Sequence, residues 1–142
     1  MANQEHVAVL KQGTAVWRLW RDENNGSAPD FTGASLAGVR LNRADLSRAN
    51  FSGASLAFAC FKMADLREAN FSGAALEAVD FGGANLEGAC LSHANLQGAN
   101  LQGANLRNAS LRGANLANAN LAQADFTGAD LTDVDPGAGN VT

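Results

Sequence analysis

A large apolar residue recurs at every fifth position along most of the chain. The series runs from Phe31 to Leu131 without an interruption and contains 21 leucines or phenylalanines. The residue two positions earlier is small, with Pro29 at the start and Val39 and Val79 as larger exceptions, and the residue between is usually Asn, Asp or Ser. The unit is therefore Ala-(Asn/Asp)-Leu-x-x. We expect its central residues to form the core: Phe31, Leu36, Leu41, Leu46, Phe51, Leu56, Phe61, Leu66, Phe71, Leu76, Phe81, Leu86, Leu91, Leu96, Leu101, Leu106, Leu111, Leu116, Leu121, Phe126 and Leu131.

A period of five fits neither a helix nor an ordinary strand. Five residues advance an α-helix by about 500°, so the leucines would spiral around it, and a flat strand would send them to alternate faces. The pattern is explained if the chain turns once per repeat and every central side chain points to one axis. Ten of the fifteen glycines lie two residues after a central position, as Gly33 and Gly113 do. Glycine there permits the positive φ of a tight turn, so each unit is predicted to be a very short strand and a turn.

Tandem Ala-(Asn/Asp)-Leu-x-x units resemble the pentapeptide-repeat family, and the resemblance covers residues 30–134. It implies an all-β solenoid: a right-handed quadrilateral β-helix of about five coils, four repeats to a coil, stacked at the strand spacing of about 4.8 Å. Central residues twenty positions apart would then form columns. Phe31, Phe51 and Phe71 would share one column and Phe61 and Phe81 the facing one, so aromatic packing concentrates in the first half.

Residues 1–29 precede the repeats and have a helical composition. We predict a helix from Glu5 to about Arg21, with Gly13 as a weak point within it. Its apolar residues are Val7, Leu10, Val16, Trp17 and Trp20. Because the end of a β-helix exposes unpaired backbone and core leucines, we expect residues 1–29 to form an N-terminal cap and linker, with Trp17 and Trp20 at the first coil. The stretch Leu10 to Arg21 also resembles leaders of cyanobacterial pentapeptide-repeat proteins.

Residues 135–142 are predicted to form a flexible, turn-rich tail that is too short and polar for a second helical cap. The last coil is then open, masked by the tail, or covered by another copy of the chain. A monomer and a homodimer stacked through the C-terminal coils both fit this pattern.

Composition limits the function classes. The net charge of −4 disfavours direct nucleic-acid binding, for which a basic excess is typical. No apolar run approaches the roughly 18 residues of a membrane-spanning helix. The N-terminus lacks the basic segment and apolar stretch of a secretory signal. We therefore expect a cytoplasmic protein without membrane contact, either as it stands or after removal of a leader.

No catalytic motif is present, so we predict neither enzyme activity nor a cofactor or metal site. Ser92 and His93 are adjacent, but no carboxylate lies on the same stretch, and His6 is far away. Isolated motifs of this kind are weak evidence for chemistry.

Two further groups need a structural explanation. Asp45, Asp65 and Asp125 share one column, where a pair of neighbouring carboxylates could attract a cation or raise one pKa. We favour the alternative that these side chains bond to the local backbone at a corner. Cys60 and Cys90 lie one and a half coils apart, on opposite sides of the rod, so we expect no disulfide between them.

Phe58 is the one phenylalanine outside the core register, and it occupies a position where glycine is usual. Ala37, Ala57 and Ala78 lie around it, and Met63 takes the equivalent place on the adjacent side. Exposed aromatic clusters often mark interfaces. Two interpretations stay open: these five residues form an interaction patch, or the N-terminal segment folds over them.

Charge is also uneven. The basic residues Arg40, Arg43, Arg48, Lys62 and Arg67 concentrate in the first two coils. Between Glu87 and Asp125 no acidic residue occurs, and Arg107 and Arg112 are the only formal charges, so Asn and Gln fill that surface. We interpret this surface as a solvated ladder.

These features predict a non-enzymatic scaffold or regulator that binds an unknown protein partner. The resemblance supports this, since some family members regulate partners, including cyanobacterial differentiation regulators. The alternative is a DNA-mimic inhibitor of a DNA-binding enzyme such as gyrase. Family members of that kind are long, acidic and dimeric through a C-terminal helix, whereas this chain is shorter, mildly acidic and lacks that helix.

Overall fold

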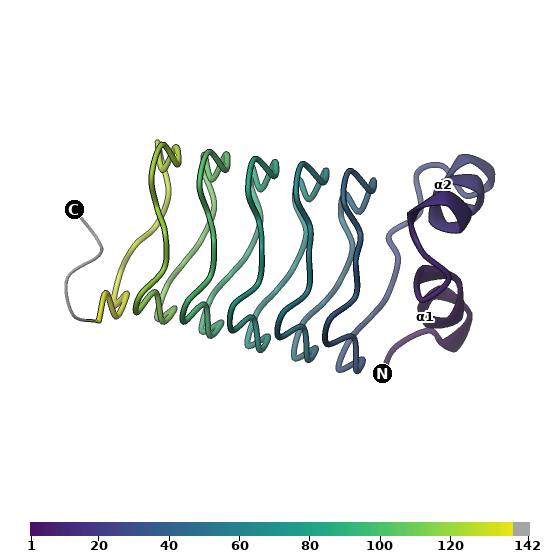
Figure 1. Ribbon diagram of the computed structural model, residues 1–142, viewed down its shortest axis with the longest axis horizontal. Coiled ribbons are helices and arrows are strands. Elements are labelled where there is room, and N and C mark those ends of the chain that lie inside the picture. The colour runs from purple at the N-terminus through teal and green to yellow at the C-terminus, as the bar shows by residue number, and fades with distance from the viewer. Residues whose placement is uncertain (138–142) are drawn as a thin grey trace.

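The computed structural model describes residues 1–137 and consists of two short helices followed by a solenoid (Figure 1). Helix α1 spans Gln4–Leu10 and helix α2 spans Thr14–Glu23. Both helices lie at one end of the rod, and the coils stack away from them along its long axis (Figure 1). Of the predicted tail 135–142, Asp135 still pairs with Asn115, whereas positions 138–142 lie outside the described residues.

The solenoid is held together by isolated parallel bridges between residues twenty positions apart. The first joins Asp30 to Asn50 and the last joins Asn115 to Asp135. Four five-residue repeats therefore complete one turn, and the columns predicted from the sequence are present. At each bridge, two backbone hydrogen bonds link successive coils, such as Asn50 N–H to Pro29 O at 2.8 Å and Phe31 N–H to Asn50 O at 2.7 Å. Within residues 1–137 the bridges do not extend into longer strands, because a turn follows each one at once.

The turns have the backbone conformation that the glycine pattern predicts. Gly33, two residues after Phe31, has a φ of 67°, and the turn closes through a hydrogen bond from Ala34 N–H to Phe31 O at 3.0 Å. Other residue types adopt the same conformation at equivalent positions, among them His93 at 59° and Asn118 at 60°. Each side of the solenoid thus consists of one bridging residue between two left-handed turns.

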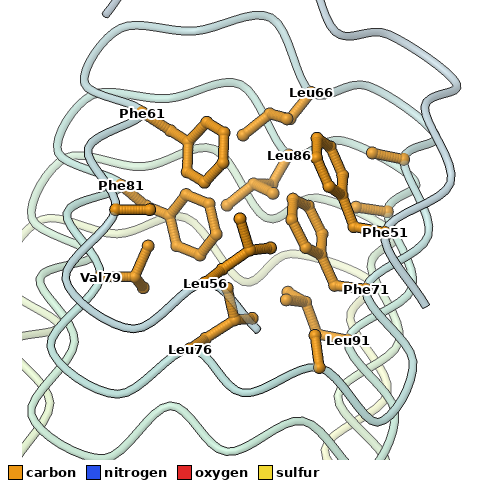
Figure 2. Packing of buried hydrophobic residues seen from close by; sticks show 14 of the residues in the cluster. Phe51, Leu56, Phe61, Leu66, Phe71, Leu76, Val79, Phe81, Leu86 and Leu91 are labelled. Carbon is orange, nitrogen blue, oxygen red and sulfur yellow. The ribbon is translucent and has the colours of Figure 1, made fainter. Parts of the chain in front are cut away.

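The core is a buried column of Leu, Phe and Ala. Every central residue from Phe31 to Leu116 is at most 2% exposed. Phe51 stacks on Phe71 with ring centroids 4.9 Å apart, and Phe61 stacks on Phe81 at 5.5 Å. Figure 2 shows these two pairs facing one another across the core, with leucines filling the space between them. The rings meet edge to face, as Phe61 and Phe71 do at 6.1 Å. This geometry is favourable for aromatic pairs.

The prediction of one helix from Glu5 to Arg21 is wrong, because the chain breaks at Gly13. Gly13 has a φ of 98° and precedes the first residue of α2, a conformation that other residues rarely adopt. Helix α1 starts after Asn3, whose side chain accepts hydrogen bonds from the backbone of Glu5 and His6. The break lets two short helices cross the end of the rod where one straight helix would cover less of it.

The helices close the first coil. Trp17 is fully buried; its ring stacks on Trp20 at 4.7 Å and lies 5.7 Å from the ring of Phe31. The indole Nε1–H of Trp17 donates to the backbone oxygen of Asp45 at 2.7 Å. Leu10 is buried beside them. The cap therefore supplies both apolar cover and a hydrogen-bond donor for the free backbone edge of the solenoid.

Candidate interaction surface

Phe58 is the most exposed aromatic side chain in the described chain, at 73% of its full area. Its φ is 62°, in the left-handed region. Its column contains Gly38 in the coil before it and Ala78 in the coil after it, which leave its ring without large neighbours. The alternative that the N-terminal segment covers Phe58 is wrong, because the cap lies over the end of the rod instead.

Met63 occupies the next turn and is 53% exposed, with a φ of 60°. Its sulfur lies over Gly83 in the following coil, where it fills the space that a side chain at Gly83 would need. Ala37 and Ala78 are exposed, and Ala57 is half-buried. We call Phe58, Met63, Ala37, Ala57 and Ala78 the Phe58 patch. It borders two corners of the rod, with the bridging residue Cys60 between them.

Both large side chains are held in an unfavourable backbone conformation. A left-handed φ costs a non-glycine residue about 1–2 kcal/mol. A buried side chain could recover that free energy through packing, but Phe58 and Met63 remain largely in water. Their presence is therefore not explained by the stability of the fold.

Unpaired basic side chains lie on the same side of the rod as the Phe58 patch. Arg40 precedes Cys60 in the column of bridging residues, and Arg43 and Lys62 lie at the corner beside Met63. Within residues 1–137, the ion pairs involve Arg21, Arg67, Arg107 and Arg112. Arg40, Arg43 and Lys62 have no carboxylate partner in this described part of the chain. The border of the patch toward the first coil is thus basic, whereas Glu77 and Asp80 adjoin Phe58 and Cys60 from the following coil.

The aspartates of the column bond to the local backbone, which is the interpretation that the sequence favoured. Asp45 Oδ1 accepts from the Ser47 backbone at 3.1 Å, and Asp65 Oδ1 accepts from the Arg67 backbone at 3.2 Å. Burial raises the pKa of the Asp45 carboxyl, but hydrogen bonds from Ser47 and the charge of Arg21 outweigh it, and the pKa falls below its usual value. Hydrogen bonds from the Arg67 side chain lower the pKa of Asp65 against the effect of burial. The possibility that one carboxyl of this pair has a raised pKa is therefore wrong.

The same aspartates are neutralised by arginine. Asp45 lies 3.4 Å from Arg21, Asp65 lies 2.6 Å from Arg67, and Asp125 lies 3.2 Å from Arg107. No cluster of three or more His, Cys, Asp or Glu residues with metal-binding geometry occurs in residues 1–137. This side of the rod does not present the uninterrupted negative charge that imitation of a DNA backbone requires.

The remaining candidates for chemistry are the histidine and serine at positions 93 and 92 and the two cysteines, and their contacts belong to the fold. His93 lies in a left-handed turn with its ring over Gly113, while the neighbouring Ser92 hydroxyl pairs with Ser110 at 2.9 Å. Cys60 and Cys90 are free thiols. Burial raises the pKa of Cys90, but its hydrogen bonds with Ser72 and Ser92 outweigh this effect and lower the pKa overall. None of these contacts aligns a nucleophile with a base.

Two cap residues have roles that the sequence pattern did not indicate. His6 Nδ1 accepts a hydrogen bond from Asp30 N–H at 3.0 Å. Arg21 is 6% exposed and donates to the backbone oxygens of Ser27 and Ser47, each at 2.8 Å. Both lie outside the five-residue period, so only a tertiary contact identifies them. An arginine at the end of a tryptophan-rich helix was the one available signal.

No helix in residues 1–137 is long and apolar enough to cross a membrane.

Comparison with known families agrees with the repeat pattern. The family model described as pentapeptide repeats matches residues 30–67, 64–103 and 94–133. No curated protein matches the chain at a significant level.

Solved structures with the same architecture come from a plant and from cyanobacteria. A pentapeptide repeat protein of the Arabidopsis thaliana thylakoid lumen is 42% identical, with a TM-score of 0.63, over 64% of this chain and 63% of that one. One from Cyanothece 51142 is 35% identical, with a TM-score of 0.60, over 79% of this chain and 67% of that one. One from Nostoc PCC 7120 is 31% identical, with a TM-score of 0.63, over 83% of this chain and 95% of that one. This chain thus spans less than two thirds of the thylakoid protein.

Proposed function

Because this chain belongs to the pentapeptide-repeat family, we propose that it is a non-enzymatic scaffold that binds another protein through the Phe58 patch. Proteins of this family are generally structural or interaction proteins. The binding surface would consist of Phe58 and Met63, with Ala37, Ala57 and Ala78 as the small residues that keep it open. The rod itself would act as a rigid support that holds these side chains in fixed positions.

One observation carries this proposal. Two large apolar side chains occupy left-handed turns, where glycine is the commonest residue, and both remain exposed. A bound partner would bury them and recover the free energy that the turns cost. Aromatic residues at such positions often dominate the binding energy of an interface. Arginine pairing along the aspartate column makes DNA mimicry the weaker alternative.

Affinity capture from a lysate of the source cells tests the proposal when three versions of the protein are compared. Phe58→Gly removes the aromatic ring and relieves the turn, so the fold is retained. Asn118→Gly is the matched control, because Asn118 lies in the same column with a φ of 60° but outside the Phe58 patch. We expect one protein to be retained by the wild type and by Asn118→Gly and lost from Phe58→Gly.

Equal retention of that protein by all three versions would remove the Phe58 patch as the binding surface. Retention of no protein by any version would contradict the scaffold function. A supercoiling assay then addresses the alternative, since a DNA-mimic inhibitor would reduce gyrase activity at high excess and a scaffold would leave it unchanged.

A further inference from the structure

The first coil has a free backbone edge on two of its four sides. In later coils each bridging residue uses both its N–H and its C=O toward the coil before it, as Ser55 does with Ala34 at 2.9 Å and Leu36 at 2.8 Å. The first coil has no preceding coil, and its bridging residues are Asp30, Ser35, Arg40 and Asp45. Their backbone groups need partners from another element or from water.

The helical cap supplies partners on only two sides. Asp30 donates to His6 and accepts from Asn3 N–H at 3.0 Å, and the Asp45 oxygen accepts from Trp17. Ser35 and Arg40 are exposed, and neither their N–H nor their C=O groups have a hydrogen-bond partner among residues 1–137. We call residues 35–42 the free rim.

A trough runs between helix α1 and part of this rim. One hollow of about 310 Å³ lies between α1 and residues 32–35, and a second of about 410 Å³ follows residues 35–39. Lys11 and Ser35 line both hollows, so the two adjoin. Leu36 and Val39 give the second hollow an apolar floor. The trough therefore has room for an extended chain beside the unpaired backbone of Ser35.

The basic side chains beside the trough indicate which kind of polypeptide segment would bind there. Lys11 is the only charged side chain that lines either hollow. Arg40 and Arg43 continue along the next side, and neither has a carboxylate partner in the described residues. A segment with acidic side chains would meet three cations, Lys11, Arg40 and Arg43, none of which forms an ion pair within residues 1–137.

We propose that the free rim binds an extended, acidic polypeptide segment as an added strand. The segment would donate to Ser35 C=O and accept from Ser35 N–H, as the preceding coil does elsewhere in the rod, and its acidic side chains would face Lys11 and Arg40. Addition of a strand to an exposed sheet edge is a general mode of peptide recognition. A nucleic acid fits less well, because phosphate oxygens cannot donate to the free carbonyl groups.

This inference rests on the scaffold function and names the chemistry of its partner. The free rim adjoins the Phe58 patch, because Gly38 N–H bonds to Ala57 O at 2.9 Å and Ala37 belongs to both surfaces. One partner could therefore place an extended acidic segment on the rim and an apolar side chain against Phe58. The two surfaces use different contacts, so substitutions separate them.

The test is an NMR titration of the isotope-labelled protein with the acidic heptapeptide Thr-Val-Asp-Val-Glu-Val-Thr. The same peptide with lysine in place of Asp and Glu is the charge control. We expect saturable shifts of the Ser35 and Arg40 amide signals with the acidic peptide and much weaker binding of the lysine peptide. Absence of saturable binding in the millimolar range, or equal binding of both peptides, would overturn the inference.

Three variants locate the site. Ser35→Pro removes an N–H that has no internal partner, so no hydrogen bond of the fold is lost, and we expect binding to weaken about three- to tenfold, the effect of one hydrogen bond. Ser35→Ala keeps the N–H and should bind as the wild type does. Lys11→Glu should weaken binding about two- to fivefold or more, since it reverses a charge. Unchanged binding by both Ser35→Pro and Lys11→Glu would exclude the rim.

Phe58→Gly separates the rim from the proposed function. We expect this variant to bind the acidic peptide as tightly as the wild type does, although it loses the captured protein. If Phe58→Gly loses its protein partner while the acidic peptide never binds, the scaffold function stands and the rim inference is wrong. If the peptide binds at the rim while no protein depends on Phe58, the rim inference stands and the Phe58 patch is wrong.

Discussion

The two ends of the solenoid differ in how their cores meet water. At the N-terminal end Phe31 is fully buried beneath Trp17 and Leu10. At the C-terminal end of the described residues Leu121 and Phe126 are partly exposed, and Leu131 is 41% exposed. The repeats at the two ends have the same pattern, so the difference comes from the segment that precedes the first coil. The comparison teaches that this repeat builds a core but does not close one.

The backbone explains why a coil cannot seal its own edge. Each bridging residue bonds only to the coil before it, and the residues on either side of it bond to the coil after it. Every terminal coil therefore keeps free donors and acceptors, which must be satisfied by another element or by solvent. In the cap, His6, Trp17 and Arg21 serve this purpose with side-chain groups.

A homodimer stacked through the C-terminal coils would erase the contrast between the ends. Two copies that bury Leu121, Phe126 and Leu131 against each other would give about twice the mass of one chain, as two-fold stacking requires. Light scattering at high protein concentration checks this prediction. The mass of a single chain under those conditions would contradict the dimer.

Trp17→Ala should produce the largest loss of stability. The substitution opens a cavity over Phe31 and removes the donor to the Asp45 oxygen, so we expect a loss of about 3–5 kcal/mol in the free energy of unfolding. Chemical denaturation measures it. The control is Leu19→Ala in the same helix, since Leu19 is 66% exposed and its loss should cost under about 0.5 kcal/mol. Equal costs would mean that the cap does not seal the core.

The same substitution placed inside the rod and at its open end sharpens the comparison. Leu101→Ala removes a fully buried side chain and should cost about 2–5 kcal/mol. Leu131→Ala, measured in dilute protein, should cost less than about 1 kcal/mol, because the leucine is already partly in water. Gln102→Ala, one residue beyond Leu101 and outward, should cost less than about 0.5 kcal/mol. If Gln102→Ala cost as much as Leu101→Ala, the five-residue register would be wrong.

Turns near the two ends should respond differently to glycine. Phe58→Gly removes a large side chain from a left-handed turn, and we expect a gain in stability of about 1 kcal/mol. Asn118→Gly, in the last described coil of the same column, should gain less, since asparagine tolerates this conformation better than most residues. Thermal unfolding of both variants measures the difference. A loss of stability in Phe58→Gly would mean that the exposed ring packs against something.

The smallest expected effect is the loss of stability at low pH. The folded-state pKa values of Asp45 and Asp65 lie below the usual value of 3.8, so their contribution to stability is fully present above about pH 4 and is lost as the pH falls through the lowered values. Thermal unfolding at a series of pH values should show a decline in this acidic range. Asp45→Asn should flatten the decline. An unchanged pH profile would contradict the role of Ser47 and Arg21 at this carboxyl.

The sequence by itself determined the repeat, its core and its turns. A leucine or phenylalanine at every fifth position can be buried if the chain turns once per repeat, and the glycine positions mark the left-handed residues. These are local properties repeated many times, so the pattern is strong. The four repeats per coil were implied by the resemblance to the pentapeptide-repeat family. The sequence also placed Phe58 outside the core register. It left open whether the N-terminal segment covers this side chain.

Only the tertiary structure decided how the rod ends. The break at Gly13, the burial of Arg21 and the bond between His6 and Asp30 depend on how two short helices cross the first coil, and no periodic signal encodes that arrangement. The free rim at Ser35 and Arg40 has the same origin, because it is the part of the edge that the cap does not reach. The five-residue repeat determines the contacts between coils, because they recur along the chain. The contacts between the cap helices and the edge of the first coil each form only once, so they depend on the shapes and hydrogen bonds of particular residues.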